Sequence, residues 1–97
     1  MSSEKTSMPN SLNEHWMPFT SNRDFKERPR LITSAKGVYL KNHEGQTQID
    51  ASSGLFCNPL GHGRIEIIDA ITNQLKTLDY AQPFQQGFGG SFELATR

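Results

Sequence analysis

Three histidines and one cysteine carry the side chains best suited to metal binding or nucleophilic catalysis. His15, His43 and His62 have no cysteine or acidic partner at metal-ligand spacing, and Cys57 has no base near it in the sequence. Asp50 precedes two serines, but the G-x-S-x-G elbow of a hydrolase is missing. We therefore expect no metal site and no nucleophile, a buried thiol at Cys57, and structural roles for the histidines.

Two glycine-rich runs stand before apolar or helix-like segments. Gly61-His62-Gly63 resembles an anion cradle at a helix start, but Glu66 occupies the place of the third glycine of the dinucleotide fingerprint. The run from Gly87 to Ser91 is not followed by the lysine of a P-loop. For Gly61-His62-Gly63 a structural turn is the favoured interpretation.

Large apolar side chains gather in segments that hold too much glycine and proline for regular structure. They are Trp16, Phe19, Leu55, Phe56, Tyr80, Phe84 and Phe88. Ligand pockets are lined by apolar and aromatic side chains, and binding residues concentrate on loops. The same composition would anchor loops to a further body of protein, and the two interpretations are compatible.

The elements that must position these loops begin with a small antiparallel sheet. We expect a strand at Leu31 to Ala35 and a β-hairpin between Gly37 and Ser53, turning at residues 42–45 with Gly45 at positive φ. Alternation predicts one buried face on the hairpin. That face would consist of Val38, Leu40, Ile49 and Ala51.

The clearest regular element is a helix from Arg64 to Leu78. Its apolar stripe consists of Ile65, Ile68, Ile71, Leu75 and Leu78. Ser91 is expected to cap a further helix from Phe92 to Arg97. A helix that stops after six residues without a stop signal indicates a piece of a longer chain.

The N-terminal region is polar and then aromatic. We expect a short helical turn that ends at Met17-Pro18, a loop after it, and an exposed connection at Lys26 to Pro29. The chain is accordingly divided into a flexible arm at 1–14, a segment with the hairpin at 15–63, and a helix followed by a loop at 64–97. The predicted fold class is α+β.

Composition bounds the possible partners. Ten Lys and Arg balance ten Asp and Glu, so no charged field gathers nucleic acid or anionic lipid. There is no secretory signal, no apolar run of the ~18 residues that a membrane helix needs, and no second cysteine for a disulfide. We expect a soluble, cytoplasmic protein that binds neither nucleic acid nor membrane.

Four segments, taken in order and spacing, resemble the opening of class III aminotransferases, in the ω-amino acid:pyruvate branch that includes the β-alanine enzymes. They are His15-Trp16-Met17-Pro18-Phe19-Thr20, Ser34-Ala35-Lys36-Gly37-Val38-Tyr39, Ile49-Asp50-Ala51-Ser52-Ser53-Gly54-Leu55-Phe56-Cys57 and Gly61-His62-Gly63-Arg64-Ile65-Glu66-Ile67. The resemblance implies a fold-type I homodimer that uses pyridoxal 5'-phosphate, with its active site at the dimer interface. This chain would supply part of the small domain and lead into a missing large domain.

The resemblance also implies substrate-binding residues. By position, Phe19, Phe56 and Phe84 would line the pocket, with Leu55 beside Phe56 and Phe84 reaching across the subunit boundary. Phe56 stands where relatives commonly have tryptophan, so the indole N–H donor and some volume are lost.

The family's chemical machinery has no counterpart in these residues. The Schiff-base lysine, the phosphate-binding Gly-Ser-Glu helix start, the aspartate on the pyridinium nitrogen and the substrate-binding arginine are missing. The resemblance implies that the complete enzyme moves an amino group from an ω-amino acid or amine, such as β-alanine, to pyruvate, and that this chain alone is inactive.

Two alternatives remain open. One is the adenosylmethionine-8-amino-7-oxononanoate aminotransferase of the same family, although Trp16-Met17-Pro18 favours the ω-amino acid branch. The other is a stand-alone α+β binding module whose aromatic loops take up a peptide or metabolite.

Overall fold

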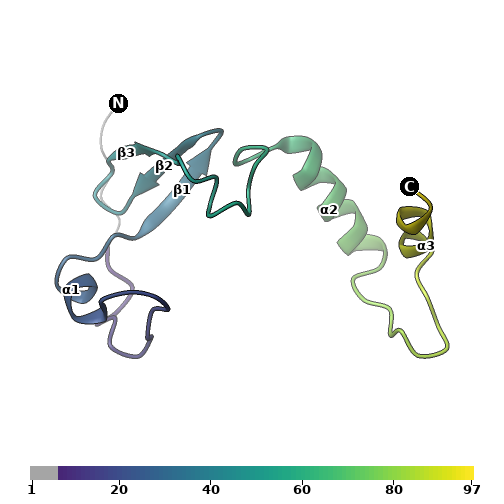
Figure 1. The fold of residues 1–97 in the computed structure, drawn as a ribbon, viewed down its shortest axis with the longest axis horizontal. Coiled ribbons are helices and arrows are strands. Elements are labelled where there is room, and N and C mark those ends of the chain that lie inside the picture. Colours follow the sequence, from purple (N-terminus) through teal and green to yellow (C-terminus); the bar gives the residue numbers. More distant parts are fainter. Residues whose placement is uncertain (1–6) are drawn as a thin grey trace. The chain divides into compact units, whose positions relative to one another are not determined.

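The computed structural model describes residues 7–97 and divides the chain into two compact units, one extending to Arg64 and one from Ile65 to Arg97 (Figure 1). The first unit contains α1 (Asn22–Glu27), β1 (Ile32–Lys36), β2 (Tyr39–Asn42) and β3 (Thr47–Ile49), and the second contains α2 (Ile65–Thr77) and α3 (Gly89–Thr96). Helices with a three-stranded antiparallel sheet confirm the predicted α+β class.

The sheet has the order β1-β2-β3, and Asn42 organises its hairpin turn. Asn42 N donates to Gln46 O at 3.0 Å, and Asn42 Oδ1 accepts from Glu44 N at 3.0 Å and from Gln46 N at 2.9 Å. Gly45 has φ +82°, a region that glycine enters without steric cost. The hairpin and the positive φ of Gly45 are therefore confirmed.

The predicted face of the hairpin is wrong by one residue of register. Tyr39 pairs with Ile49 and Leu40 with Gln48, so Leu40 and Ile49 lie on opposite faces. The three-residue turn between Asn42 and Gln46 fixes this register, and a shift of one residue sends every side chain to the other face. Val38 and Ile49 are both exposed, so the predicted buried face does not form.

The N-terminal helix lies after Pro18 and not before it. The predicted helical turn ending at Met17 is wrong, and Lys26, expected in an exposed connection, belongs to α1. Phe25, on the inner side of this helix, is 8% exposed and is the buried large apolar side chain of the described residues. Residues 7–14 of the predicted arm contain no helix or strand, and the rest of that arm lies outside the described residues.

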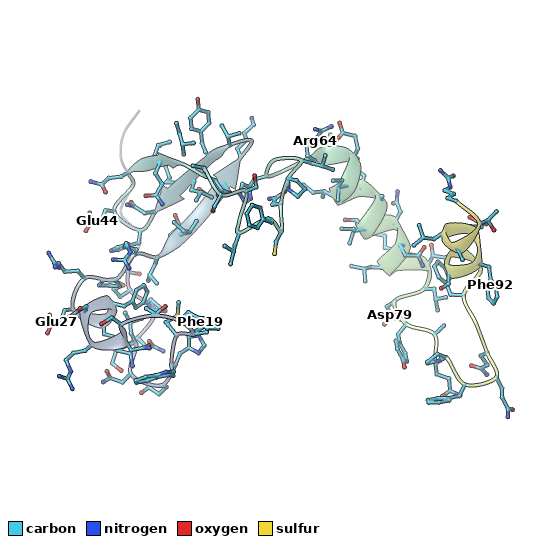
Figure 2. All side chains as sticks on the ribbon, viewed as in Figure 1. Phe19, Glu27, Glu44, Arg64, Asp79 and Phe92 are labelled. Carbon is cyan, nitrogen blue, oxygen red and sulfur yellow. The ribbon has the colours of Figure 1, made fainter. Side chains whose placement is uncertain are left out.

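The long helix agrees with its prediction to within one residue at each end. Figure 2 shows the side chains of α2 projecting from its ribbon, and none of the residues of this helix is buried. Ile68, Ile71 and Leu75 of its apolar stripe are exposed. Among residues 7–97, no helix is long and apolar enough to cross a membrane.

The last helix begins earlier than predicted. Phe88, and not Ser91, occupies the N-cap position of α3, and Ser91 N donates to Phe88 O at 3.1 Å. The ring of Phe88 lies where a Cβ of Gly90 would be, so only a glycine admits it there. Gly90 thus allows the ring to pack against the first helical turn.

Candidate functional site

Leu55 and Phe56 lie in a turn of left-handed backbone. Four consecutive residues have positive φ: Ser53 at +53°, Gly54 at +61°, Leu55 at +57° and Phe56 at +67°. Phe56 N donates to Ser52 O at 3.0 Å, the spacing of one helical turn. Left-handed helical backbone costs an L-residue about 1–2 kcal/mol, and glycine escapes this cost. Three of the four residues are therefore strained, and their surroundings must hold them.

Asp50 holds the beginning of this turn. Its Oδ1 accepts from Gly54 N at 3.0 Å and from Ser52 Oγ at 3.4 Å, while its Oδ2 lies 2.8 Å from His62 Nε2. The side chain is only 7% exposed. The Gly54 N–H first, and then the His62 ring, lower the pKa of the Asp50 carboxyl below its ordinary value. Asp50 is therefore a carboxylate at neutral pH.

His62 connects Asp50 to the end of the turn and to the sheet. Its Nδ1 lies 2.7 Å from Asn58 Nδ2, an amide donor, so we assign the ring proton to Nε2, which donates to Asp50. Asn58 N in turn donates to Ser53 O at 2.8 Å. The backbone of His62 exchanges two hydrogen bonds of 2.8 Å with Gly37, at the turn between β1 and β2. We call Asp50, Asn58 and His62 the turn-holding network.

Sequence reasoning missed this network. It treated His62 as a loop residue without an acidic partner, whereas the structure supplies Asp50, twelve positions earlier in the chain. The backbone of His62 is used in the bridge to Gly37, which agrees with the structural turn predicted for the glycine run. One pattern in the sequence points to this network. An apolar loop has Asp50 before it, at the end of a strand, and a histidine between two glycines after it.

The predicted buried thiol at Cys57 is wrong, because Cys57 is exposed. It directly follows the left-handed turn, and its Sγ lies 3.7 Å from Leu55 O. The apolar surroundings expected for the thiol do not form in these residues, since Leu55 and Phe56 are themselves exposed.

Phe19 lies on a second clamped loop of the first unit. Its φ is +50° and its side chain is fully exposed. Asn22, only 5% exposed, closes this loop: its Oδ1 accepts from Met17 N at 2.7 Å, and its Nδ2 donates to Met17 O at 2.9 Å and to Thr20 O at 3.0 Å. A single buried amide thus fixes the segment that carries Phe19.

Phe84 lies in the second unit, in the loop between α2 and α3. It is exposed, its neighbour Gln85 has φ +62°, and Gln82 Nε2 donates to Phe84 O at 3.4 Å. The structure therefore joins Leu55 and Phe56 in one turn, places Phe19 on another loop of the same unit, and places Phe84 in the other unit.

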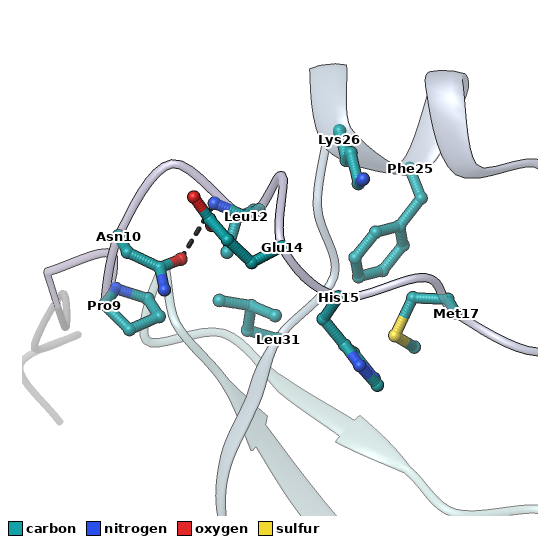
Figure 3. A pocket seen from close by; sticks show the side chains of 9 residues that line it. All are labelled: Pro9, Asn10, Leu12, Glu14, His15, Met17, Phe25, Lys26 and Leu31. Atoms are coloured by element: carbon teal, nitrogen blue, oxygen red, sulfur yellow. Dashed lines mark hydrogen bonds between the residues drawn. The ribbon is translucent and has the colours of Figure 1, made fainter.

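A cavity of about 290 Å³ lies under the N-terminal segment and does not contain any of these four residues (Figure 3). His15, Met17, Phe25 and Leu31 contribute to its lining. Leu12 N donates to Asn10 Oδ1 at 2.8 Å at its rim. Its walls are mainly apolar, although Glu14 and Lys26 also line it, and it is a gap beside the small core around Phe25.

No protein-family model matches the chain. Individual proteins do. The chain is 45% identical over 87 residues to the β-alanine–pyruvate aminotransferase of Pseudomonas aeruginosa, and 46% identical over 86 residues to the ω-amino acid–pyruvate aminotransferase of Pseudomonas putida. These matches cover 90% and 89% of this chain but 19% of each relative, so the chain spans about a fifth of their length.

The solved structures that match the chain are also aminotransferases. The adenosylmethionine-8-amino-7-oxononanoate aminotransferase of Methanocaldococcus jannaschii matches with a TM-score of 0.78 and 34% identity, over 84% of this chain and 19% of that one. The ω-transaminase of Pseudomonas jessenii, solved in complex with PMP, matches with a TM-score of 0.77 and 29% identity, over 88% of this chain and 20% of that one.

Proposed function

Because the chain belongs to the class III aminotransferases, in the branch of the ω-amino acid:pyruvate enzymes, we propose that it forms a substrate-facing segment of such an enzyme. The complete enzyme moves an amino group from an ω-amino acid or amine, such as β-alanine, to pyruvate. The observation that carries this proposal is the 45% identity over 87 residues. A match of that length in a chain of 97 residues takes in the turn of Leu55 and Phe56.

The proposed substrate-binding residues are Phe19, Leu55, Phe56 and Phe84. Three of them lie on loops whose backbone is fixed by internal hydrogen bonds, yet their side chains are exposed. Exposed apolar groups on ordered loops are suited to a pocket wall, since such a wall is completed by other parts of the protein. Phe84 is proposed to reach the site across the boundary of a homodimer.

The cofactor proposed for the enzyme is pyridoxal 5'-phosphate, which supplies an electron sink for the amino-group transfer. The lysines described here do not fit the role of its anchor. Lys26 Nζ donates to Asn13 O at 3.3 Å and lies over the Trp16 ring, Lys36 and Lys41 belong to strands, and Lys76 lies in the last turn of α2. We propose that residues beyond these hold the cofactor, that the present chain is inactive by itself, and that the enzyme is cytoplasmic.

The second candidate is an adenosylmethionine-8-amino-7-oxononanoate aminotransferase, favoured by the structural match to the Methanocaldococcus jannaschii enzyme. The sequence identities weigh against it, since they reach 46% with the ω-amino acid enzymes and 42% with the matched enzymes of the second kind.

The test is an assay of the longer protein that contains this chain, supplied with pyridoxal phosphate. We expect alanine to form from β-alanine and pyruvate, and no amino transfer from adenosylmethionine. Transfer from adenosylmethionine to 8-amino-7-oxononanoate, without activity on β-alanine, would establish the second candidate.

A further inference from the structure

The turn from Ser53 to Phe56 presents a physical problem that the fold must solve. Three non-glycine residues hold positive φ in sequence, and the two apolar side chains among them are exposed. Apolar packing within the described chain therefore does not hold the turn in place. Its hydrogen bonds must do so.

Two of these hydrogen bonds involve Asp50 and Asn58, and the His62 ring joins these two residues. Asp50 receives the amide of Gly54 within the turn, Asn58 donates its amide to Ser53 O from the far end, and the His62 ring lies between the two side chains with one nitrogen on each. The main chain of His62 forms two hydrogen bonds with Gly37, so the position of the ring is fixed relative to the sheet. At 23% exposed, it is partly shielded from competing water.

The roles of the two ring nitrogens explain why histidine occupies this position. The ring must accept from Asn58 at Nδ1 and donate to Asp50 at Nε2, at fixed spacing and in one plane. Glutamine offers a donor and an acceptor, but both at the end of a flexible chain and close together. It would satisfy one partner and lose the other.

We propose that His62 is a positioning residue that, through Asp50 and Asn58, holds the left-handed turn Ser53–Phe56 so that Leu55 and Phe56 present a fixed apolar surface to the amino donor. The holding of the turn stands on the contacts above. The presentation to a donor rests on the proposed function.

The first readout is structural and independent of activity. In the longer enzyme, His62→Gln should accelerate hydrogen exchange of the backbone amides of Gly54, Phe56 and Asn58 by roughly tenfold, because Asp50 or Asn58, which bond to the turn, would lose its contact with residue 62. His15→Gln is the matched control, because His15 lies outside the turn-holding network, and it should leave these amides unchanged.

The second readout is kinetic. His62→Gln should raise the KM for the amino donor by about five- to tenfold and change kcat less, because a mobile apolar surface weakens binding of the donor more than it slows the chemical step. Ser53→Gly in the same chain should restore the KM to within about twofold, because glycine accepts positive φ without the network's help.

The outcomes separate the two proposals. Faster exchange together with a raised KM that Ser53→Gly rescues supports the positioning role. Unchanged exchange in His62→Gln, or a raised KM that Ser53→Gly leaves unrescued, overturns it even if the wild-type enzyme is an active transaminase. If the enzyme is inactive on all amino donors, the proposed function is refuted, and so is the proposal that Leu55 and Phe56 face the donor. If hydrogen exchange in that enzyme still responds to His62→Gln, the proposal that His62 holds the turn stands.

Discussion

The Nε2 of His62 lies 2.8 Å from Oδ2 of Asp50, and this contact joins residues twelve positions apart in the chain. Leu55 and Phe56, which the resemblance assigns to the substrate pocket, lie between Asp50 and His62. The backbone that carries these two proposed pocket residues is therefore bonded to polar groups outside the turn.

Acid should open this closed segment. The pKa of Asp50 is lowered from 3.8, first by the Gly54 N–H and then by His62, so its contribution to stability is fully present above that value. The contribution is lost as the pH falls through the lower pKa of the folded state. The Gly54 amide shift, followed by NMR during acid titration, should report this loss. Asp50→Asn should remove the transition, and a transition that persists in this variant would contradict the assignment.

Removing the buried amide of Asn22 should loosen the loop of Phe19. Asn22→Ala leaves the backbone groups of Met17 and Thr20 without their partners, and unpaired groups of this kind cost about 1–3 kcal/mol. In the longer enzyme, faster hydrogen exchange of the Met17 amide should show the decrease. Asn13→Ala is the control, since Asn13 contributes its main-chain carbonyl to Lys26 and should lose little. Equal effects of the two variants would contradict the role of the Asn22 side chain in closing the loop.

Substitutions at two neighbouring positions of the left-handed turn should change the stability of the first unit in opposite directions. Gly54→Ala should destabilise the first unit by about 1–2 kcal/mol, because the nearest atom to a new Cβ is Asn58 Cβ at an ordinary 3.6 Å and the penalty is purely conformational. Ser53→Gly should stabilise the unit by a smaller amount. Hydrogen exchange of the Phe56 amide in the longer enzyme measures both. Destabilisation by Ser53→Gly would mean that the Ser53 side chain contributes more than its backbone strain costs.

The exposed stripe of α2 should make the isolated chain associate. Ile68, Ile71 and Leu75 lie exposed on this helix, and exposed apolar patches promote self-association. Sedimentation should show partly disordered or self-associating material, and Ile68→Gln combined with Leu75→Gln should reduce the association. Asn73→Gln is a polar control on the same helix. Sharp, cooperative unfolding of a monomer would contradict this prediction.

The ring at Phe56 should influence which amines are accepted. Phe56→Trp adds volume and an indole donor at an exposed position of the turn. In the longer enzyme we expect a several-fold lower kcat/KM for bulky amines and little change for β-alanine. An unchanged ratio between bulky and small donors would place Phe56 outside the pocket wall.

Elements governed by local pattern could be predicted from the sequence. The 3.6-residue period of Ile65, Ile68 and Ile71 defines α2 to within one residue, and Asn42 with Gly45 defines the hairpin turn. The register was missed because it depends on whether the turn has two, three or four residues, which alternation alone does not determine.

Features that depend on distant partners were not predictable in this way. The helix α1 begins at Asn22, whose side chain closes the loop behind it, and the ring of Phe88, at the start of α3, lies where a Cβ of Gly90 would be. The turn-holding network joins residues up to twelve positions apart without any periodic pattern. The roles of Phe19, Leu55, Phe56 and Phe84 stay predictions, since they depend on the resemblance and not on contacts within the chain.

The backbone of Ser53, Leu55 and Phe56 has the handedness natural to amino acids of opposite chirality. For a D-residue the same dihedral angles are relaxed, and the side chain is retained, which a glycine cannot offer. Chemical ligation that introduces D-serine at position 53 would therefore separate the energetic cost of the turn from the chemistry of its side chains.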